Sequence, residues 1–199
     1  MQQAPVLLFD ISGVLVELGG MPEFVRWSGM SEKQVGDSWL VCESARALES
    51  GRIGFSEFHT AFVDEWNIEI TQDALREAFA SWVSVAFDGA IDLLQELQPR
   101  YRLACLCNTN EVQWPVVRKT IQADRFFPMQ FISHLMGRVK PDPVTFTHVV
   151  QALNTTPENI VYFDDSWRNV ESAQAFQINA FQVSGVGEVR QVLASLGLL

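Results

Sequence analysis

Short apolar segments recur along the chain, and most of them are apolar at nearly every position rather than at every second position. Segments of this kind are typical of parallel strands in a sheet that is covered on both faces, because each side chain then meets a buried layer. We predict four such strands and a weaker fifth one: residues 5–10, 101–107, 159–164 and 179–183, and residues 129–133.

Between these segments, apolar residues recur at helical spacing. In residues 88–99, Ile91, Leu94 and Leu97 share one helical face, and Pro99 follows as a stop signal. The same pattern predicts further helices over residues 142–154, 167–177 and 188–197. Alternating strands and helices predict a doubly wound α/β fold, in which a parallel sheet is flanked by helices and the crossovers are right-handed.

Residues 20–86 interrupt this alternation, because their pattern predicts helices and no strand. A first helix is expected from Ser31, which stands with Gln34 in capping-box positions, to Gly51. Two more helices are expected over residues 55–66 and 71–85. We therefore predict a core domain and a small all-helical domain inserted after the first strand: residues 1–19 with 87–199, and residues 20–86.

Composition narrows the class of protein. The 199 residues carry 14 basic and 24 acidic side chains, a net charge of −10, and the basic ones form no stripe. Nucleic-acid backbones require clustered cations, so we expect no nucleic-acid partner, whereas a small phosphate ligand remains compatible. No apolar run approaches the roughly 18 residues of a membrane span, so no membrane partner is expected.

Two further features bear on the compartment. The segment "MQQAPVLLFD" lacks the basic region and the cleavage site of a signal peptide, so we expect a cytoplasmic protein. The three cysteines are Cys42, Cys105 and Cys107, an odd number that argues against a disulfide framework.

Polar residues follow the predicted strands at the points where those strands end. In an open parallel sheet, ligands bind outside the carboxyl ends of the strands. Three carboxylates and one lysine are expected to meet there, and carboxylates so close together repel one another unless a cation such as Mg²⁺ lies among them. The residues expected at this edge are Asp10, Ser12 and Gly13; Cys107, Asn108, Thr109 and Asn110; Ser133 and Lys140; and Asp164, Asp165 and Ser166.

Four motifs in order, "FDISGVL", "LCNTN", "GRVKPDP" and "VYFDDSWRN", resemble those of the haloacid dehalogenase (HAD) superfamily over essentially the whole chain. A helical insertion directly after the first motif is similar to the C1 cap of subfamily I. The last three motifs resemble most the branch of subfamily IA that contains α-D-glucose-1-phosphate phosphatases. The resemblance implies a HAD-like Rossmannoid core and a hydrolase, most simply a Mg²⁺-dependent phosphatase of a small phosphorylated metabolite.

The resemblance also implies roles for residues. Asp10 would attack phosphorus to form an aspartyl-phosphate, which water then hydrolyses. Mg²⁺ would be held by the Asp10 carboxylate, the Ser12 carbonyl and Asp165, with Asp164 supporting these ligands. Lys140 would pair with Asp10 and the phosphoryl oxygens. The phosphoryl group would bind Cys107, Asn108 and Thr109.

The sequence departs from the family's pattern at two positions. Ser12 stands where typical HAD phosphatases have a second aspartate, the general acid and base, so weak or narrowed phosphatase activity is expected. Cys107 stands where the family usually has a hydroxyl residue, which is a stronger hydrogen-bond donor. These departures leave two alternatives open: a metal-independent 2-haloacid dehalogenase-like hydrolase, although those enzymes carry an aromatic residue at the position of Ser12, and a catalytically impaired phosphate-binding protein.

Simpler interpretations exist for the same residues. Asp10 could only terminate a strand, Asp164 and Asp165 could only cap a helix, and Ser12 could only fill a tight turn. Cys107 is expected to be a small buried residue rather than a reactive thiol. The four motifs in order favour the catalytic interpretation for the three acidic residues. Neither the oligomeric state nor the substrate follows from the sequence.

Overall fold

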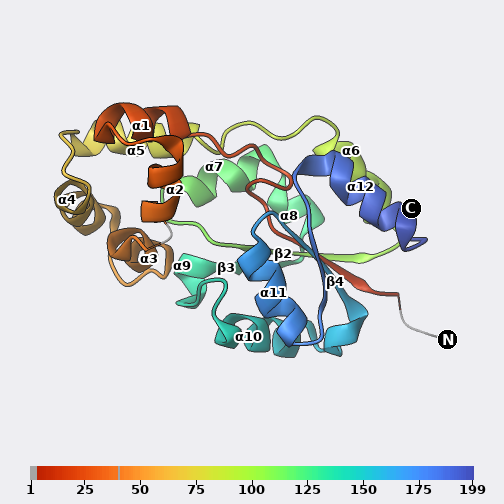
Figure 1. The fold of residues 1–199 in the computed structure, drawn as a ribbon. Helices are drawn as coiled ribbons and strands as arrows, with labels where there is room; N and C mark the ends of the chain where they lie inside the picture. The colour runs from red at the N-terminus through yellow and green to blue at the C-terminus, as the bar shows by residue number, and fades with distance from the viewer. Residues whose placement is uncertain (1–3, 40) are drawn as a thin grey trace.

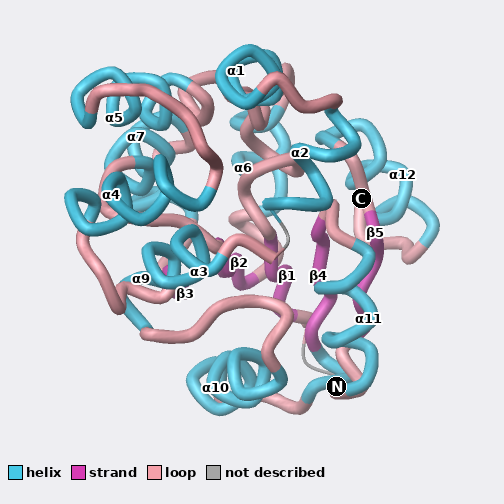
Figure 2. Tube along the Cα trace, turned by 60° about the vertical axis from the view of Figure 1, so that its left-hand side comes forward, coloured by secondary structure: helices cyan, strands magenta, loops and turns pink. Residues whose placement is uncertain are grey.

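The computed structural model of the chain describes residues 4–39 and 41–199. Five strands form one parallel sheet (Figure 1), and Figure 2 labels them in the order β3-β2-β1-β4-β5. The strands are β1 (Val6–Phe9), β2 (Arg102–Cys107), β3 (Met129–Ile132), β4 (Ile160–Asp164) and β5 (Asn179–Gln182). This architecture confirms the predicted α/β fold class, and all five predicted strands are present.

Helices cover both faces of the sheet (Figure 2). Side chains alternate along β1, so that Leu7 and Phe9 face one apolar layer while Val6 and Leu8 face the other. The first layer contains α6 (Ala90–Leu97), α7 (Gln113–Thr120), α8 (Ala123–Phe126) and α12 (Gly185–Ser195). The second contains α10 (Pro143–Leu153) and α11 (Trp167–Ala175). The short elements α9 (Ser133–Met136) and η1 (Pro157–Asn159) follow β3 and precede β4.

The helices that precede α6 in the segment between β1 and β2 form a separate group, which lies at one end of the sheet (Figure 1). We call them the helical group: α1 (Met21–Ser28), α2 (Glu32–Trp39), α3 (Glu43–Glu49), α4 (Phe55–Glu65) and α5 (Gln72–Ser81). They enclose their own apolar cluster, in which Phe62 contacts the rings of Phe24, Phe58 and Trp66. Ring pairs of this kind add about 0.5–1.5 kcal/mol each beyond area burial.

The single helix predicted over residues 31–51 is wrong, because the structure has α2 and α3 there. A new helix begins at Cys42, whose sulfur accepts a hydrogen bond from Ala45 N at 3.4 Å. Glu65 accepts bonds from both Ser44 N and Ser44 Oγ and thereby satisfies further donors of this first turn. These long-range contacts, which the sequence pattern does not display, start a new helix within a segment of continuous helical periodicity.

Helices α1, α7, α8 and α9 are absent from the sequence-based prediction. Helices α1 and α7 each carry a proline in the first turn, Pro22 and Pro115, where a helix tolerates it but a sequence pattern suggests a loop. The other two have four residues each, too few to show a helical period. Among the described residues, no helix is long and apolar enough to cross a membrane.

The chain enters and leaves the helical group through two connections that pair with each other. Glu17 N donates to Val85 O at 2.8 Å and Gly19 N donates to Trp82 O at 2.8 Å. Val16 and Ala86 form an antiparallel bridge between the same connections. We call residues 15–19 and 82–87 the paired connection. It joins the helical group to the sheet at one place.

Candidate active site

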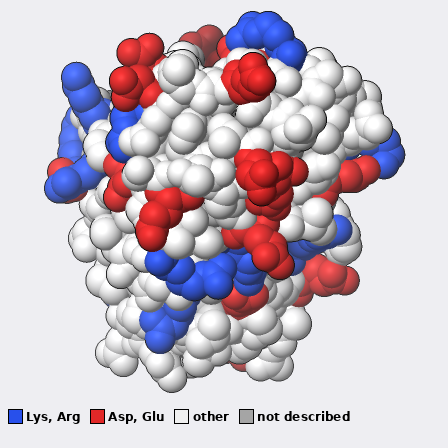
Figure 3. Space-filling view, turned by 90° about the vertical axis from the view of Figure 1, so that its left-hand side faces the viewer, with Lys and Arg blue, Asp and Glu red and all other residues white. Residues whose placement is uncertain are grey.

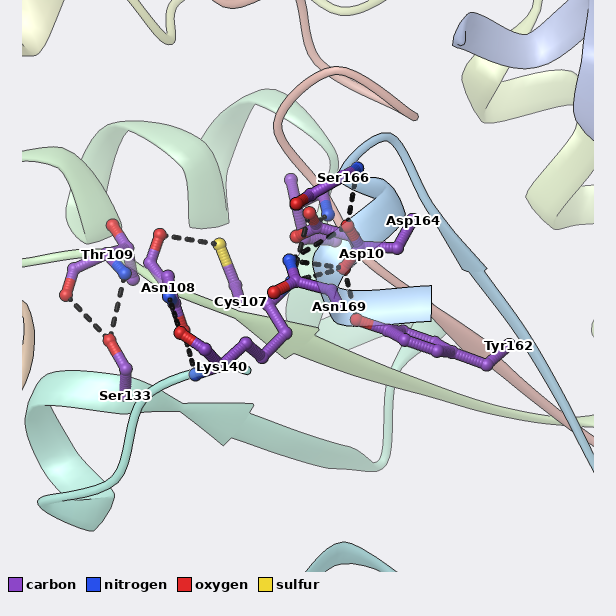
Figure 4. Close-up of polar contacts among 11 residues, drawn as sticks. Asp10, Cys107, Asn108, Thr109, Ser133, Lys140, Tyr162, Asp164, Ser166 and Asn169 are labelled. Atoms are coloured by element: carbon purple, nitrogen blue, oxygen red, sulfur yellow. Dashed lines mark hydrogen bonds and ion pairs between the residues drawn. The ribbon is translucent and has the colours of Figure 1, made fainter. Parts of the chain in front are cut away.

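Asp10 and Asp164 come together because β1 and β4 are neighbours in the sheet. Phe9 pairs with Phe163, and Asp10 N continues the ladder by donating to Phe163 O at 2.8 Å. Both carboxylates therefore project at the carboxyl edge of the sheet, and both are buried. Figure 4 shows them facing the same small space.

Lys140 lies between these two carboxylates. Its Nζ is 2.9 Å from Asp10 Oδ2 and 2.7 Å from Asp164 Oδ2, and its side chain is 1 % exposed. Burial alone would lower the pKa of Lys140, but the two carboxylates outweigh it and raise that pKa, so the ammonium stays charged. Burial raises the pKa of Asp10 well above its ordinary value, and Lys140 opposes this shift.

Asp164 is the most heavily engaged carboxylate of the site. Besides Lys140, it accepts hydrogen bonds from the Tyr162 hydroxyl, from Ser166 N at 2.8 Å and from Asn169 Nδ2 at 2.9 Å. Charge-assisted hydrogen bonds from several donors fix both carboxylate oxygens. Asp164 therefore positions Lys140, and through it Asp10.

Asp165 approaches the same space from the turn after β4. Oxygens of Asp10, Asp164 and Asp165 lie within 4.8 Å of one another. Burial raises the pKa of Asp165, and Asp164 adds to the shift. Gly13 permits the approach, because a side chain there would collide with the Asp165 carboxylate. Three oxygen donors that repel one another fit a hard divalent cation.

The backbone of the loop after β1 offers a further oxygen. A bridge between Ser12 and Val16 uses hydrogen bonds from Gly13 N to Val16 O and from Val16 N to Ile11 O. Neither bond uses the Ser12 carbonyl oxygen. This oxygen can therefore bind a metal ion, and the side chain at position 12 does not matter for that role. Ser12 itself is partly buried.

The residues after β2 are hydrogen-bonded to the segments that follow β3. Asn108 accepts a hydrogen bond from Lys140 N at 2.8 Å and donates one to Lys140 O at 3.0 Å, so its side chain fixes the lysine backbone. Thr109 N donates to Ser133 Oγ at 2.9 Å, which ties β2 to the end of β3. Cys107 is fully buried, and burial raises the pKa of its thiol, so it is not a reactive thiolate. The substrate contacts predicted for Cys107, Asn108 and Thr109 stay predictions.

Two pockets open between the sheet edge and the helical group. The apolar pocket, about 260 Å³, is lined by residues that include Phe24, Trp39, Phe79 and Trp82, and Ser12 also lines it. The polar pocket, about 240 Å³, is lined by residues that include Arg46, Lys140, Ser166 and Arg168. Trp39, Glu49 and Asn108 line both pockets, so the two are adjacent parts of one cleft.

The face that carries the helical group has a mixed charge (Figure 3). Basic side chains form a short band across the middle of this view, and acidic side chains lie above and below it. Such a band can attract a small anion without forming the long basic stripe that nucleic acids require.

Sequence reasoning missed Tyr162, Asn169 and Glu49. Tyr162 stands two residues before Asp164, and strand periodicity could have placed both on one face of β4. Asn169 follows Asp164 by five residues in the first turns of α11, where a contact back to the strand end is possible. Glu49 gave no signal, because its place depends on how α3 packs against the sheet edge.

Comparisons with known proteins identify the family of this chain. Residues 5–177 match the model of the haloacid dehalogenase-like hydrolase family. A curated relative, flavin mononucleotide hydrolase 1 of Arabidopsis thaliana, is 24 % identical over 202 residues, which cover 99 % of this chain and 79 % of the relative. That relative is described as chloroplastic, so the cytoplasmic location expected for this chain stays a prediction.

Solved structures share the fold. A HAD family enzyme from Bacteroides thetaiotaomicron, solved with magnesium and inorganic phosphate, has a TM-score of 0.74 at 24 % identity and covers 90 % of this chain and 94 % of its own. The L-2-haloacid dehalogenase of Xanthobacter autotrophicus has a TM-score of 0.67 at 17 % identity and covers 91 % and 78 %. The match over residues 5–177 confirms the resemblance seen in the four motifs: the chain belongs to the haloacid dehalogenase-like hydrolase family.

Proposed function

We propose that this hydrolase is a Mg²⁺-dependent phosphatase of small phosphorylated metabolites that uses Asp10 as its nucleophile. The observation that carries the proposal is the buried ammonium of Lys140, held 2.9 Å from Asp10 and 2.7 Å from Asp164. A nucleophilic carboxylate must stay ionised and must approach an anionic phosphoryl group. A fixed cation beside it serves both needs.

Mg²⁺ fits the donor set described above. Asp10, Asp165 and the Ser12 carbonyl would hold it, and Asp164, whose oxygens already accept several hydrogen bonds, would support these ligands. When bound, the ion supplies positive charge that offsets the repulsion between carboxylates and phosphoryl oxygens. Gly13 keeps open the space in which Asp165 approaches Asp10.

The chain's own residues then account for two steps. An Asp10 carboxylate oxygen attacks phosphorus, the bond from phosphorus to the ester oxygen breaks, and an aspartyl-phosphate forms. Water attacks this intermediate at phosphorus, which releases inorganic phosphate and restores the carboxylate. Lys140 neutralises charge on Asp10 and on the phosphoryl oxygens throughout. Asn108 keeps Lys140 in place through its two backbone contacts.

We also propose that the helical group is the cap domain, residues 20–86, over a core of residues 1–19 and 87–199. Its aromatic pocket favours esters whose organic part carries an apolar or aromatic ring, because ring surfaces bury well against Phe24, Trp39 and Trp82. Flavin mononucleotide, the substrate in the name of the Arabidopsis thaliana relative, combines such a ring with an alkyl phosphate and is therefore a suitable test compound.

The test is hydrolysis of p-nitrophenyl phosphate and flavin mononucleotide with Mg²⁺ and with a chelator, in wild type and Asp10→Asn. We expect Mg²⁺-dependent release of phosphate that disappears in Asp10→Asn, and an acid-stable phosphate on Asp10 after quenching. No turnover of either ester and no adduct with fluoroberyllate at Asp10 would contradict the proposal. Halide release from 2-haloacids without metal would instead establish the dehalogenase alternative.

A further inference from the structure

The proposed phosphatase lacks an obvious proton donor, because Ser12 occupies the position from which a carboxyl group would protonate the departing oxygen. General acid–base assistance contributes about 10²–10⁴-fold to such reactions. The other carboxyl groups at the sheet edge have different tasks. Asp10 is the nucleophile, and Asp164 is held by Lys140, Tyr162 and Asn169.

Glu49 is the carboxyl group that faces the cleft from the opposite side. Among the residues that line the apolar and polar pockets, it is the one acidic side chain, and it lines both. Within residues 4–39 and 41–199, its carboxyl group takes part in no hydrogen bond or ion pair. Glu49 is therefore free to exchange a proton with a molecule bound in the cleft.

Contacts on both sides of Glu49 fix its place over the sheet edge. Three residues earlier, Arg46 pairs with Asp142 at 2.6 Å, in the segment directly after Lys140. Two residues later, Gly51 lies so close to the backbone of His134 that no side chain would fit. Phe55 N then donates to Glu111 Oε1 at 2.8 Å. The segment from α3 to the first residue of α4 is thus attached to the core at three points, one before Glu49 and two after it.

The direction of the reaction places the departing oxygen on the same side as Glu49. In phosphoryl transfer, the attacking and departing oxygens lie roughly in line through phosphorus. Asp10 attacks from the sheet edge, so the departing oxygen points away from the sheet into the cleft beneath the helical group. Ser12, which follows β1, and Glu49, at the end of α3, both line this cleft.

We propose that Glu49 is the general acid and base of the phosphatase reaction, in place of the carboxyl group missing at position 12; this inference rests on the proposed function. The protonated carboxyl gives its proton to the ester oxygen as the bond from phosphorus to that oxygen breaks. The resulting Glu49 carboxylate then takes a proton from the water that attacks the aspartyl-phosphate. Phosphate leaves, and both Asp10 and Glu49 return to their starting states.

The electrostatics of the cleft agree with this role. Burial raises the pKa of Glu49 to about 7, and Lys140 and Arg46 oppose the shift. The other charged or titratable groups that line the polar pocket are Cys42 and Arg168. A carboxyl group with a pKa near the working pH can both give and accept a proton.

The test compares Glu49→Gln with Glu43→Gln, which makes the same change at an exposed position of the same helix. The probes are phenyl phosphate and p-nitrophenyl phosphate with Mg²⁺. Phenoxide departs poorly without a proton, whereas p-nitrophenoxide departs readily. We expect Glu49→Gln to lower kcat/KM for phenyl phosphate by about 10²–10⁴-fold and to change kcat/KM for p-nitrophenyl phosphate far less. Glu43→Gln should match wild type.

Two further readouts separate proton transfer from a merely structural role. With p-nitrophenyl phosphate, Glu49→Gln should release a burst of p-nitrophenolate followed by slow turnover, because the aspartyl-phosphate forms but its hydrolysis lacks a base. With phenyl phosphate, wild-type kcat/KM should fall as the pH rises through about 7, and Glu49→Gln should lose this dependence. Adding Ser12→Asp to Glu49→Gln should restore activity on phenyl phosphate.

Other outcomes overturn the inference. Equal losses on both esters, or a change in KM alone, would show that Glu49 only positions the substrate. Wild-type behaviour of Glu49→Gln would remove any role for it while leaving an Asp10-dependent phosphatase in place. Absence of Asp10-dependent turnover in wild type would overturn the proposed function itself, and the role of Glu49 with it.

Discussion

The sheet edge and the helical group hold their side chains in different ways. At the edge, Lys140, Asp10 and Asp164 are buried charges that depend on one another, so removing one leaves the others uncompensated. In the helical group, Phe62 and its neighbours pack as rings without charge. The stability of the sheet edge should therefore depend mainly on side-chain charge, and the stability of the helical group mainly on side-chain volume. The proposed function accordingly assigns the reaction to the sheet edge and the choice of substrate to the helical group.

The strongest test of the comparison is Lys140→Met. Removing one partner of a buried ion pair costs about 3–5 kcal/mol, and here two carboxylates lose their cation, so we expect a loss of this size in the free energy of unfolding and loss of turnover. Lys33→Met, which breaks an ion pair whose lysine is 85 % exposed, should change the free energy of unfolding far less, because solvent screens an exposed pair. Urea denaturation measures both.

The loss of stability in Lys140→Met should also depend on pH. Without Lys140, burial raises the pKa of Asp10 with no ammonium to oppose it, so the folded state favours the protonated acid more than the unfolded state does. Stability that depends on a raised carboxyl pKa is present at low pH and is lost as the pH rises. The deficit of Lys140→Met should therefore be larger at mildly alkaline pH than at mildly acidic pH. A deficit independent of pH would contradict this account.

Phe62→Ala tests the other side of the comparison. Truncation of a fully buried phenylalanine costs about 3–5 kcal/mol, so unfolding should become easier by that amount. Because Phe62 does not line either pocket, kcat of the folded variant on p-nitrophenyl phosphate should stay near wild type. Leu135→Ala, at a side chain 70 % exposed, should change stability by no more than about 0.5 kcal/mol. If kcat of Phe62→Ala fell together with its free energy of unfolding, the packing of the helical group would also affect the reaction at the sheet edge.

Gly13→Ala should act on stability moderately and on metal binding more strongly. Gly13 has a φ of +80°, where a side chain costs about 1–2 kcal/mol, and the new Cβ would also displace Asp165. Gly29→Ala is the matched control, because Gly29 has a φ of +67° but nothing within 4 Å of the added atom. Thermal unfolding with and without Mg²⁺ should show a stabilising shift in wild type and in Gly29→Ala, and a smaller shift in Gly13→Ala. Equal Mg²⁺-induced shifts of the unfolding temperature in all three proteins would show that Asp165 is not a ligand of the proposed metal site.

Arg46→Ala should have the smallest effect. The ion pair with Asp142 joins the helical group to the core, but its side chains are 48 % and 41 % exposed, so its removal should cost less than about 1 kcal/mol. Arg118→Ala, which breaks a pair of similar exposure with Asp124, gives the reference value. A markedly larger loss for Arg46→Ala in urea denaturation would mean that this pair is needed to dock α3.

The strands and the core of the site were predictable, because both depend on local sequence. A nearly continuous apolar segment followed by Asp10 already describes a buried strand that ends at a binding edge, and the fold class derived from it was confirmed. Asp164 and Lys140 could be assigned to the same edge by motif order. The two hydrogen bonds between Asn108 and Lys140 were not predictable, because they join residues 32 positions apart.

The helical group was harder to predict for the same reason. The boundary between α2 and α3 depends on contacts between Ser44 and Glu65, which are 21 positions apart. Glu49 appears in the sequence as an ordinary helical glutamate, and only the attachment of α3 to the core brings it into the cleft. Helical periodicity indicates which residues face inward, but it does not indicate which neighbouring structure they face.

The paired connection has a consequence for how this protein can change over evolutionary time. Its two chains lie side by side, so the helical group leaves and rejoins the sheet at nearly the same point, with Gly19 bonded to Trp82. A segment whose ends meet can lengthen, shorten or be replaced without altering the strand order on either side of it. If the proposed function holds, exchange within this segment could change which substrates are accepted and leave Asp10, the proposed nucleophile, in place at the end of β1.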